Sequence, residues 1–381
     1  MKVKVAVIGV GRMGSIHARN LKLGLIKGAT LACICDIKDE ALSSFIKKHG
    51  RTKTYEDYKL MLEKENIDAV IVSTQHYFHG DIVKYCIEKG KHVLCEKPMT
   101  VTAEEARSVL KEANKRPELV LAVMWNQRTN PIHQKAYKLV QSGKIGKLIR
   151  MNYIVTDWYR SQAYYNQGGW RACLWGEGGG TLINQCVHQL DLLQWIAGFP
   201  IGVEAKMYTK GRNITVENDV IALFEYPEDV FCSFSASTHE LRGTNRLEIS
   251  GEKGRIVIEN RKMKVYTFKK CESEVNAETK SGYGFVSRKV KRYGYNLQFA
   301  LRLIRDFGEQ ASLIRNFVNS INGKGELLSP LKDGLQAVEM VNAIYISAWE
   351  KRKIQIPVDG IYYEKILKER IAQEKKYLGV E

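Results

Sequence analysis

The first hundred residues alternate between short apolar runs and segments whose apolar residues have helical spacing. The runs have the length and composition of strands buried on both faces, and they are VAVIGV at 5–10, ATLACICD at 29–36, IDAVIVST at 67–74 and HVLCEK at 92–97. A short strand is also expected near RTKTY at 51–55, and helices are expected over 15–24, 39–48, 56–64 and 76–90. Strands that alternate with helices of this length predict an α/β fold with a parallel, doubly wound sheet.

The pattern changes in the second half of the chain. Short apolar segments separated by turn residues predict strands over 203–210, 220–227, 230–238, 246–251 and 254–260. Before them, a glycine run leads into the apolar stretch 181–197. If this stretch is one helix, Asn184, His188 and Asp191 share one face, and the opposite face is formed by Ile183, Cys186, Leu190 and Leu193.

A glycine fingerprint, GVGRMG, stands between the first strand and the first helix. In this GxGxxG arrangement Gly9 permits a tight turn, Gly11 lets the backbone approach a pyrophosphate, and Gly14 lets helix and strand pack closely. The strand before it and the helix after it favour a dinucleotide site over a glycine turn of some other α/β fold. Arg12 and Met13 belong to the same turn and are expected to contact the cofactor.

The second strand ends at Asp36, in the position expected to bind the ribose hydroxyls of a dinucleotide. A carboxylate there favours a free 2′-hydroxyl and repels a 2′-phosphate, so NAD is the predicted cofactor. Ile37 is included in the predicted cofactor site. Lys38 and Arg12 keep NADP open as the alternative.

Doubly wound sheets bind their ligands at the carboxyl ends of the strands. The residues at or just after such ends are therefore expected to face the cofactor, and they are Ser73, Thr74, His79, Glu96 and Lys97. Lys97 has a further property, because the following Pro98 restrains its backbone away from helix and so fixes where the amine points.

Length and composition limit the classes of protein. The 381 residues are enough for two domains with sizeable cores, and 44% hydrophobic residues is ordinary for a folded soluble chain. The longest apolar runs have strand length, so no membrane span is expected, and a cytoplasmic protein without a targeting segment is predicted. The eight cysteines form no CxxC pair, so neither a metal site nor a disulfide framework is expected.

The net charge of +17 raises the question of an anionic partner. The densest basic segment is SRKVKRYGYN at 287–296, and the other basic residues are spread along the chain. Because no DNA- or RNA-binding motif accompanies them, a solvated, lysine-rich surface is favoured and no nucleic-acid partner is expected.

Three motifs in one order resemble the glucose–fructose oxidoreductase, inositol dehydrogenase and MocA (Gfo/Idh/MocA) family. They are the amino-terminal GxGxxG, the EKP at 96–98, and a glycine run followed by a helix with His188 and Asp191. GKIGKLIRMNYI at 143–154 is similar to the start of that family's second domain, and residues 329–358 are similar to its late helix and strand.

The resemblance implies a fold of two domains. Residues 1–124 are expected to form an NAD(P)-binding Rossmann domain with its doubly wound parallel sheet. Residues 125–381 are expected to form a substrate-binding and oligomerisation α/β domain with a large, mostly antiparallel sheet, in which residues 330–358 pack back near the first domain.

The resemblance also implies catalytic roles. His188 matches the family's histidine that exchanges a proton with the substrate hydroxyl, and Lys97 matches the lysine that polarises the reacting oxygen. Asn184 stands where many members carry aspartate. An amide cannot act as a base, but it can donate and accept hydrogen bonds, so Asn184 suits holding a sugar hydroxyl.

The segment 156–180 is dense in aromatic and arginine residues between the motifs. Aromatic faces suit sugar rings, guanidiniums suit hydroxyls or anions, and the glycines indicate a loop that closes on substrate. Together with the residues that follow the last strand of the first domain, the predicted substrate contacts beside Lys97, Asn184 and His188 are Trp125, Asn126, Arg128, Tyr159, Arg160, Trp170 and Arg171.

These observations predict an NAD-dependent oxidoreductase that moves hydride between nicotinamide and a hydroxyl or keto carbon of a sugar, cyclitol or glycoside. Two alternatives stay open. One is a redox-neutral enzyme that cleaves glycosides with tightly bound NAD, and the other is a non-catalytic regulator that senses a sugar or NAD. The resemblance also implies a homodimer or homotetramer.

Overall fold

A computed structural model of the chain describes residues 2–280, 282–284, 286–294 and 308–380, so the last two residues of the basic segment 287–296 lie outside the described part. The chain forms two compact units, Met1–Thr129 with Leu301–Val338, and Asn130–Ala300 with Glu339–Glu381. Within the described residues, no helix combines the length and the apolar character needed to cross a bilayer.

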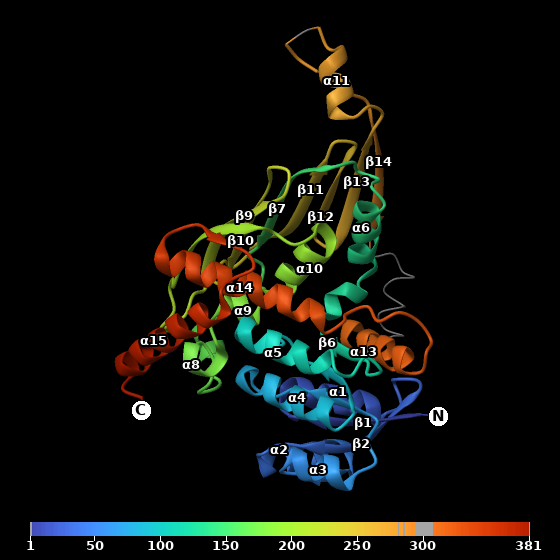
Figure 1. Ribbon diagram of the computed structural model, residues 1–381, viewed down its shortest axis with the longest axis vertical. Helices are drawn as coiled ribbons and strands as arrows, with labels where there is room; N and C mark the ends of the chain where they lie inside the picture. Colours follow the sequence, from blue (N-terminus) through green and yellow to red (C-terminus); the bar gives the residue numbers. More distant parts are fainter. Residues whose placement is uncertain (1, 281, 285, 295–307, 381) are drawn as a thin grey trace. The chain divides into compact units, whose positions relative to one another are not determined.

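The first unit contains a six-stranded parallel sheet, which confirms the predicted doubly wound α/β fold (Figure 1). The strand order is β3-β2-β1-β4-β5-β6. Chain order reverses direction on either side of β1, which is the topological switch point of such sheets. The strands are β1 Val3–Ile8, β2 Ala29–Cys35, β3 Lys53–Tyr55, β4 Ala69–Val72, β5 His92–Cys95 and β6 Leu121–Val123.

Helices connect these strands, and their ends follow local rules. In α2 the first turn carries Asp39 and Glu40 and the last turn carries Lys47 and Lys48, charges that oppose the helix dipole. The hydroxyl of Thr102 accepts a hydrogen bond from the amide of Glu105 and so caps α5. The elements are α1 Arg12–Lys22, α2 Asp39–His49, α3 Tyr58–Lys64, η1 His76–Phe78, α4 His79–Glu88, α5 Ala103–Ala113 and η2 Asn126–Thr129.

A helix from much later in the chain completes the core of the first unit. It is α13, Gly308–Ile321, drawn in orange in Figure 1 beside elements that are blue to cyan. Its buried residues belong to the same apolar cluster as Val5 of β1 and Phe45 of α2, and they are Ala311, Leu313, Ile314, Phe317 and Val318. The domain limits expected from the sequence were 1–124 and 125–381. They assign α13 to the second domain, whereas α13 belongs to the first compact unit.

The second unit contains a nine-stranded sheet, and the expected large, mostly antiparallel sheet is confirmed. Its order is β14-β13-β12-β11-β7-β10-β9-β8-β15, and of its neighbouring pairs only β7 and β10 are parallel. The strands are β7 Leu148–Val155, β8 Gly202–Tyr208, β9 Asp219–Tyr226, β10 Val230–Ser237, β11 Asn245–Gly251, β12 Gly254–Glu259, β13 Lys262–Phe268, β14 Arg288–Gly294 and β15 Ile354–Gln355.

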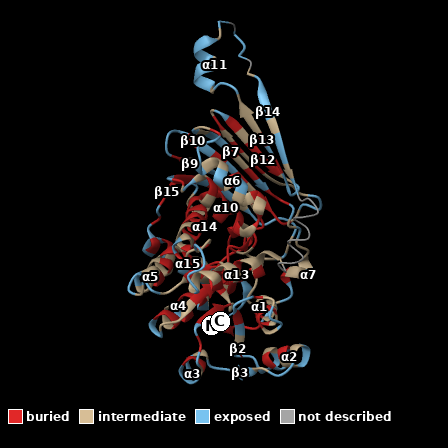
Figure 2. Cartoon of the chain, turned by 90° about the vertical axis from the view of Figure 1, so that its right-hand side faces the viewer, coloured by how far each residue is buried: buried red, intermediate tan, exposed pale blue. Residues whose placement is uncertain are grey.

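Helices cover one face of this sheet. Figure 2 shows α10 as a largely buried helix and α11 as an exposed one at the end of the β13–β14 hairpin. The ring of Tyr137 in α6 stacks on Trp195 in α10, with centroids 4.3 Å apart. The helices are α6 Pro131–Gln141, α7 Gln162–Tyr165, α8 Leu174–Glu177, α9 Thr181–Asn184, α10 Val187–Ala197, α11 Glu272–Glu278, α14 Lys332–Glu350, which begins in the first unit, and α15 Gly360–Leu378.

The contribution of α13 to the first unit is testable with one substitution. Phe317→Ala removes a ring that is 1% exposed, and we expect it to lower the free energy of unfolding by about 3–5 kcal/mol because it leaves a cavity in the core. Urea denaturation followed by circular dichroism measures this loss. Phe78→Ala, which removes a ring that is 54% exposed in the same unit, is the matched control. Equal effects of the two substitutions would show that α13 is not part of this core.

Candidate functional site

The turn between β1 and α1 requires its glycines. Gly9 has φ +86°, and a Cβ on it would lie 2.5 Å from the carbonyl oxygen of Ser73. A Cβ on Gly14 would lie 1.8 Å from the carbonyl oxygen of Gly9, so α1 packs on the turn with no room for a side chain. A Cβ on Gly11 would meet nothing within 4 Å, so a ligand can approach the backbone there at the start of α1. This geometry fits the pyrophosphate of a dinucleotide.

Asp36 follows β2 and is joined to the glycine turn. Its Oδ2 accepts a hydrogen bond from the amide of Val10 at 2.8 Å, and its Oδ1 accepts one from the amide of Lys38 at 3.0 Å. Each carboxylate oxygen has a second lone pair for a ribose hydroxyl, so the residues present fit NAD. Beside it Ile37 is 81% exposed, Arg12 is exposed and Met13 is half-buried.

His79 holds two loops of the first unit together. Its Nδ1 lies 2.7 Å from the carbonyl oxygen of Pro98, and its Nε2 lies 3.1 Å from the carbonyl oxygen of Thr74. The side chain is buried, and burial lowers the pKa of His79, so the neutral ring donates to one carbonyl at a time. The sequence predicted His79 as a cofactor contact. In the structure both its nitrogens face the backbone, so it positions Thr74 and the loop after β5.

Glu96 links the loop after β5 to α1. Its Oε1 lies 2.8 Å from Nε2 of His17, and its Oε2 accepts a hydrogen bond from the amide of Lys97 at 3.2 Å. His17 is fully buried and Glu96 is 8% exposed. Sequence reasoning missed His17, and the available signal was a histidine on the buried face of α1, beside Ala18 and Leu21. The pair fixes the backbone that carries Lys97, whose side chain is half-buried at the edge of the sheet.

The side chains that follow β6 are buried or form contacts within the first unit. Trp125 is fully buried, and Asn126 donates from Nδ2 to Oε2 of Glu309 at 3.1 Å. Arg128 is also fully buried, and its NH1 lies 2.5 Å from Oδ2 of Asp333. A guanidinium with no exposed surface is not available to a substrate. The expected substrate contact of Arg128 is therefore replaced by an ion pair between η2 and the first turn of α14.

The helix expected over 181–197 is interrupted in the second unit. It forms α9 and α10, with a turn at Gln185 and Cys186 between them. The amide of Cys186 donates to the carbonyl oxygen of Thr181, five residues back, at 2.8 Å. This wider turn places Asn184 at the end of α9 and His188 in the first turn of α10, so the two residues belong to different helices. Such wide turns occur frequently at functional sites.

His188 lies in the first turn of α10, a helix that is buried on nearly all sides. The side chain of His188 is 8% exposed, and Asp191, one turn later, is 1% exposed. Oδ1 of Asp191 accepts a hydrogen bond from Nε2 of Gln194 at 3.0 Å. The predicted apolar positions are confirmed as buried, with Ile183, Cys186, Leu190 and Leu193 each at most 1% exposed.

A buried carboxylate, Glu217, fastens the glycine run to α9. Its Oε1 accepts a hydrogen bond from the amide of Leu182 at 2.9 Å, and its Oε2 accepts from the amide of Gly180 at 3.1 Å and from the hydroxyl of Tyr345 at 2.8 Å. A Cβ on Gly179 would lie 1.9 Å from that hydroxyl, so the run passes too close to Tyr345 for any other residue. Sequence reasoning missed Glu217 because no motif marks it.

In the aromatic segment before the glycine run, two arginines lie over aromatic rings. The guanidinium of Arg160 lies 4.8 Å from the ring centre of Tyr164, and that of Arg171 lies 4.7 Å from the ring centre of Trp170. These are cation–π distances. Tyr159 keeps 39% of its surface exposed. Three of the predicted recognition residues, Arg160, Trp170 and Arg171, therefore gather with Tyr164 into one cluster of rings and guanidiniums, and Tyr159 lies next to Arg160 in the chain.

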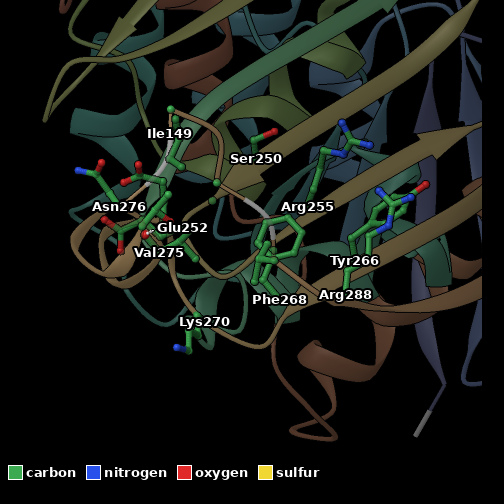
Figure 3. Close-up of a pocket in the computed structure, with 17 residues that line it drawn as sticks. Ile149, Ser250, Glu252, Arg255, Tyr266, Phe268, Lys270, Val275, Asn276 and Arg288 are labelled. Carbon is green, nitrogen blue, oxygen red and sulfur yellow. Dashed lines mark hydrogen bonds between the residues drawn. The ribbon is translucent and has the colours of Figure 1, made fainter.

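A cavity of about 600 Å³ lies elsewhere in the second unit, between the β12–β14 strands and α11 (Figure 3). The guanidiniums of Arg255 and Arg288 lie 4.9 and 5.2 Å from the ring centre of Tyr266 in its wall. None of the residues predicted as site residues lines this cavity. Among the described residues, no three His, Cys, Asp or Glu side chains gather in a way that would hold a metal ion.

Two family models match the chain. The model of an oxidoreductase family with an NAD-binding Rossmann fold matches residues 3–124, and the model of the GFO/IDH/MocA carboxyl-terminal domain matches residues 133–257. Together they cover more than half of the chain. The chain belongs to the GFO/IDH/MocA family of oxidoreductases. Its first unit contains this family's NAD-binding domain, while β13, α11 and β14 lie beyond both matched segments.

Named relatives of this family are similar over part of the chain. Myo-inositol 2-dehydrogenase of Thermotoga maritima is 26% identical over 268 residues, which are 68% of this chain and 75% of that protein. Scyllo-inositol 2-dehydrogenase (NAD(+)) of Bacillus subtilis is 31% identical over 200 residues, which are 52% of this chain and 55% of that protein. The chain thus matches about half of the second relative's length.

Solved structures of similar fold cover nearly all of the chain. The WlbA dehydrogenase of Bordetella pertussis, in complex with NADH and UDP-GlcNAcA, has a TM-score of 0.76 at 24% identity and covers 94% of this chain and 100% of that one. Levoglucosan dehydrogenase, in complex with NADH and levoglucosan, has a TM-score of 0.76 at 20% identity over the same shares. At these identities the likeness shows the fold.

The buried carboxylate of Glu217 gives a prediction about pH. Burial raises the pKa of Glu217 from 4.5 to about 7, against the hydrogen bonds that it accepts. Because the folded-state pKa is the higher one, the contribution of this group to stability is full below pH 4.5 and is lost as the pH rises through about 7. We expect it to lower the free energy of unfolding by on the order of 3 kcal/mol across that window.

Urea denaturation between pH 4.5 and 8 measures this slope in the wild type and in Glu217→Gln, where the titrating group is absent. Glu374→Gln is the matched control, because it removes another buried carboxylate of the same unit and leaves Glu217 in place. We expect the loss of stability with rising pH to be smaller in Glu217→Gln than in the wild type, by on the order of 3 kcal/mol, and to be unchanged in the control. A slope that is the same in all three proteins would contradict this expectation.

Proposed function

We propose that the protein is an NAD-dependent oxidoreductase that moves hydride between nicotinamide and a hydroxyl or keto carbon of a sugar or cyclitol. The observation that carries the proposal is Lys97, held by Glu96 at the carboxyl edge of a sheet whose glycine turn fits a dinucleotide. The names of the similar relatives, myo-inositol 2-dehydrogenase and scyllo-inositol 2-dehydrogenase, support the class of substrate.

The residues that would hold NAD lie around the carboxyl ends of β1, β2, β4 and β5. The glycine turn would take the pyrophosphate and Asp36 would take the adenosine ribose. The whole proposed set is Gly9, Gly11, Arg12, Met13, Gly14, Asp36, Ile37, Ser73, Thr74, Glu96 and Lys97, with His79 acting through the loops that it holds. When bound, the nicotinamide ring supplies the acceptor or donor of hydride.

The protein's own side chains would handle the proton and the charge. In oxidation, His188 takes the proton of the reacting hydroxyl, and in reduction it returns that proton to the oxygen. The ammonium of Lys97 donates a hydrogen bond to the same oxygen and stabilises its developing negative charge. Asn184 binds a substrate hydroxyl without carrying charge.

The cluster of rings and guanidiniums in the second unit would recognise the rest of the substrate. Tyr159 and Trp170 offer faces against which a sugar ring can pack. Arg160 and Arg171 are already stacked on aromatic rings, so their donors are oriented before a ligand binds. These four residues form the proposed recognition surface.

The test is cofactor turnover with a panel of substrates. Purified protein is mixed with NAD or NADP and with inositols, hexoses, hexuronates and alkyl glycosides, and absorbance of the reduced nicotinamide is followed. We expect turnover with NAD and one class of polyol. Lys97→Ala and His188→Ala are each expected to lower kcat by about 10²–10⁴-fold. Lys89→Ala, which removes an exposed lysine of the same unit, is expected to leave kcat unchanged.

Other outcomes of this assay contradict the proposal in different ways. Cleavage of a glycoside without net change of the nicotinamide would favour the redox-neutral alternative. Binding of NAD and a sugar with no chemistry in either direction would favour the sensing alternative. Turnover that survives both substitutions would remove Lys97 and His188 from their roles.

We also propose that copies of the chain associate through the open face of the nine-stranded sheet. The register places Ile154, Ile221, Leu223 and Phe231 on one face of three neighbouring strands, β7, β10 and β9. Each of these side chains is between 37% and 59% exposed. Polar residues of the same face separate some of them, as Ser235 separates Ile154 from Ile221, so the patch is apolar but interrupted. Exposed apolar side chains on one sheet face are typical of an interface between proteins, and a homodimer or homotetramer would cover them.

Light scattering after size exclusion tests this association. We expect the wild type to be a dimer or tetramer and Ile221→Lys to shift the population toward monomer, because a charge in the patch opposes its burial. Leu241→Lys is the control, because Leu241 is 81% exposed and lies outside the patch. A wild-type monomer, or an oligomer unchanged by Ile221→Lys, would contradict the proposed interface.

A further inference from the structure

Another buried carboxylate of the second unit, Glu177, lies against Asn184. Glu177 ends the short helix α8 just before the glycine run and is 3% exposed. Its Oε1 accepts a hydrogen bond from Nδ2 of Asn184 and lies 3.4 Å from NH1 of Arg171. Its Oε2 accepts a hydrogen bond from the amide of Ala172 at 2.8 Å. The carboxylate thus joins the aromatic segment to α9.

Two features of the loop around Glu177 are energetically unfavourable. Ala172 has φ +54°, a left-handed conformation that costs an alanine roughly 1–2 kcal/mol. Burying a carboxylate is also unfavourable unless donors surround it. Strain and buried charge that concentrate at one point are typical of functional sites.

The chemistry of the pair fixes the orientation of the Asn184 amide. A carboxylate only accepts hydrogen bonds, so the NH₂ group of Asn184 must be the end that faces Glu177. The carbonyl oxygen, Oδ1, is then directed away from Glu177. Without the carboxylate, the two ends of the amide could exchange places, because they have nearly the same shape and opposite hydrogen-bonding character.

We propose that Glu177 is a positioning residue that makes Asn184 a hydrogen-bond acceptor for a substrate hydroxyl. This inference rests on the proposed function and deepens it. It assigns a specificity rule: the substrate must present a hydroxyl donor to Asn184, and an analogue with a methyl ether or a deoxy carbon at that position is bound more weakly. A polar group left without its partner in such a site lowers kcat/KM by roughly 10–100-fold.

Exchange of the two side chains tests the inference. In Glu177→Gln the amide of Ala172 retains the carbonyl oxygen of the new side chain, so its NH₂ group faces Asn184 and favours the reversed orientation of the Asn184 amide. We expect KM for the polyol found in the panel to rise by roughly 10–100-fold with a smaller change in kcat. In Asn184→Asp two carboxylates face each other, and we expect activity that is low at pH 8 and recovers as the pH is lowered.

The double variant Glu177→Gln with Asn184→Asp restores one amide and one carboxylate in exchanged positions. Position 184 again presents an acceptor oxygen, and the amide at position 177 donates to it. We expect kcat/KM to return to within about five-fold of the wild type, a rescue that a purely structural role of Glu177 would not produce. Glu374→Gln is the matched control, because Glu374 accepts from the amides of Leu174 and Trp175 in α8 but does not contact Asn184. It should lower the melting temperature and leave KM unchanged.

The outcomes separate this inference from the proposed function. If the wild type turns over a polyol but Glu177→Gln has an unchanged KM, or the double variant is no better than the single ones, the inference is wrong and the proposed function stands. If the wild type turns over no member of the panel, the proposed function and this inference fall together. Circular dichroism of each variant shows that a lost activity is not a lost fold.

Discussion

The structure around the glycine run of the second unit depends on the carboxyl group of Glu217, which no sequence motif marks. Glu217 accepts hydrogen bonds from two amides of the segment Gly180–Leu182 and from the hydroxyl of Tyr345 in α14. It thereby joins a glycine run, the start of α9 and a long helix that are far apart in the sequence. His188 follows directly, in the first turn of α10. The glycine run leads into α9 and α10, so the buried carboxyl group of Glu217 helps to position the helices that carry Asn184 and the candidate histidine.

Much of the first unit could be predicted from the sequence, for physical reasons that are local. Apolar runs of strand length, helical spacing between them and the glycine turn each act over a few residues, and the structure confirms the doubly wound sheet that they predicted. The contacts that fix the side chains are not local. His17 meets Glu96 across 79 residues, and Arg128 meets Asp333 across 205. No spacing rule reveals such pairs, and for the same reason α13 could not be assigned to the core that it completes.

The candidate site of the second unit was predictable in composition but not in geometry. Periodicity alone placed Asn184 and His188 on one face, yet the wide turn at Gln185 and Cys186 separates them into two helices. The sequence also pointed to an amide at position 184, but it gave no sign of Glu177, which the structure places against that amide. A buried carboxylate can determine which hydrogen bonds a neighbouring side chain makes. The sequence pattern does not show which residues become neighbours in the fold.

The proposed reaction transfers hydride between a carbon of a polyol and nicotinamide. Its most direct test is the mass of the reduced cofactor after incubation of the protein with NAD and a mixture of carbon-deuterated inositols and hexoses. The account predicts reduced nicotinamide that is heavier by one deuterium, with the matching polyol converted to its ketone. NAD recovered unchanged, with every polyol intact, would contradict it.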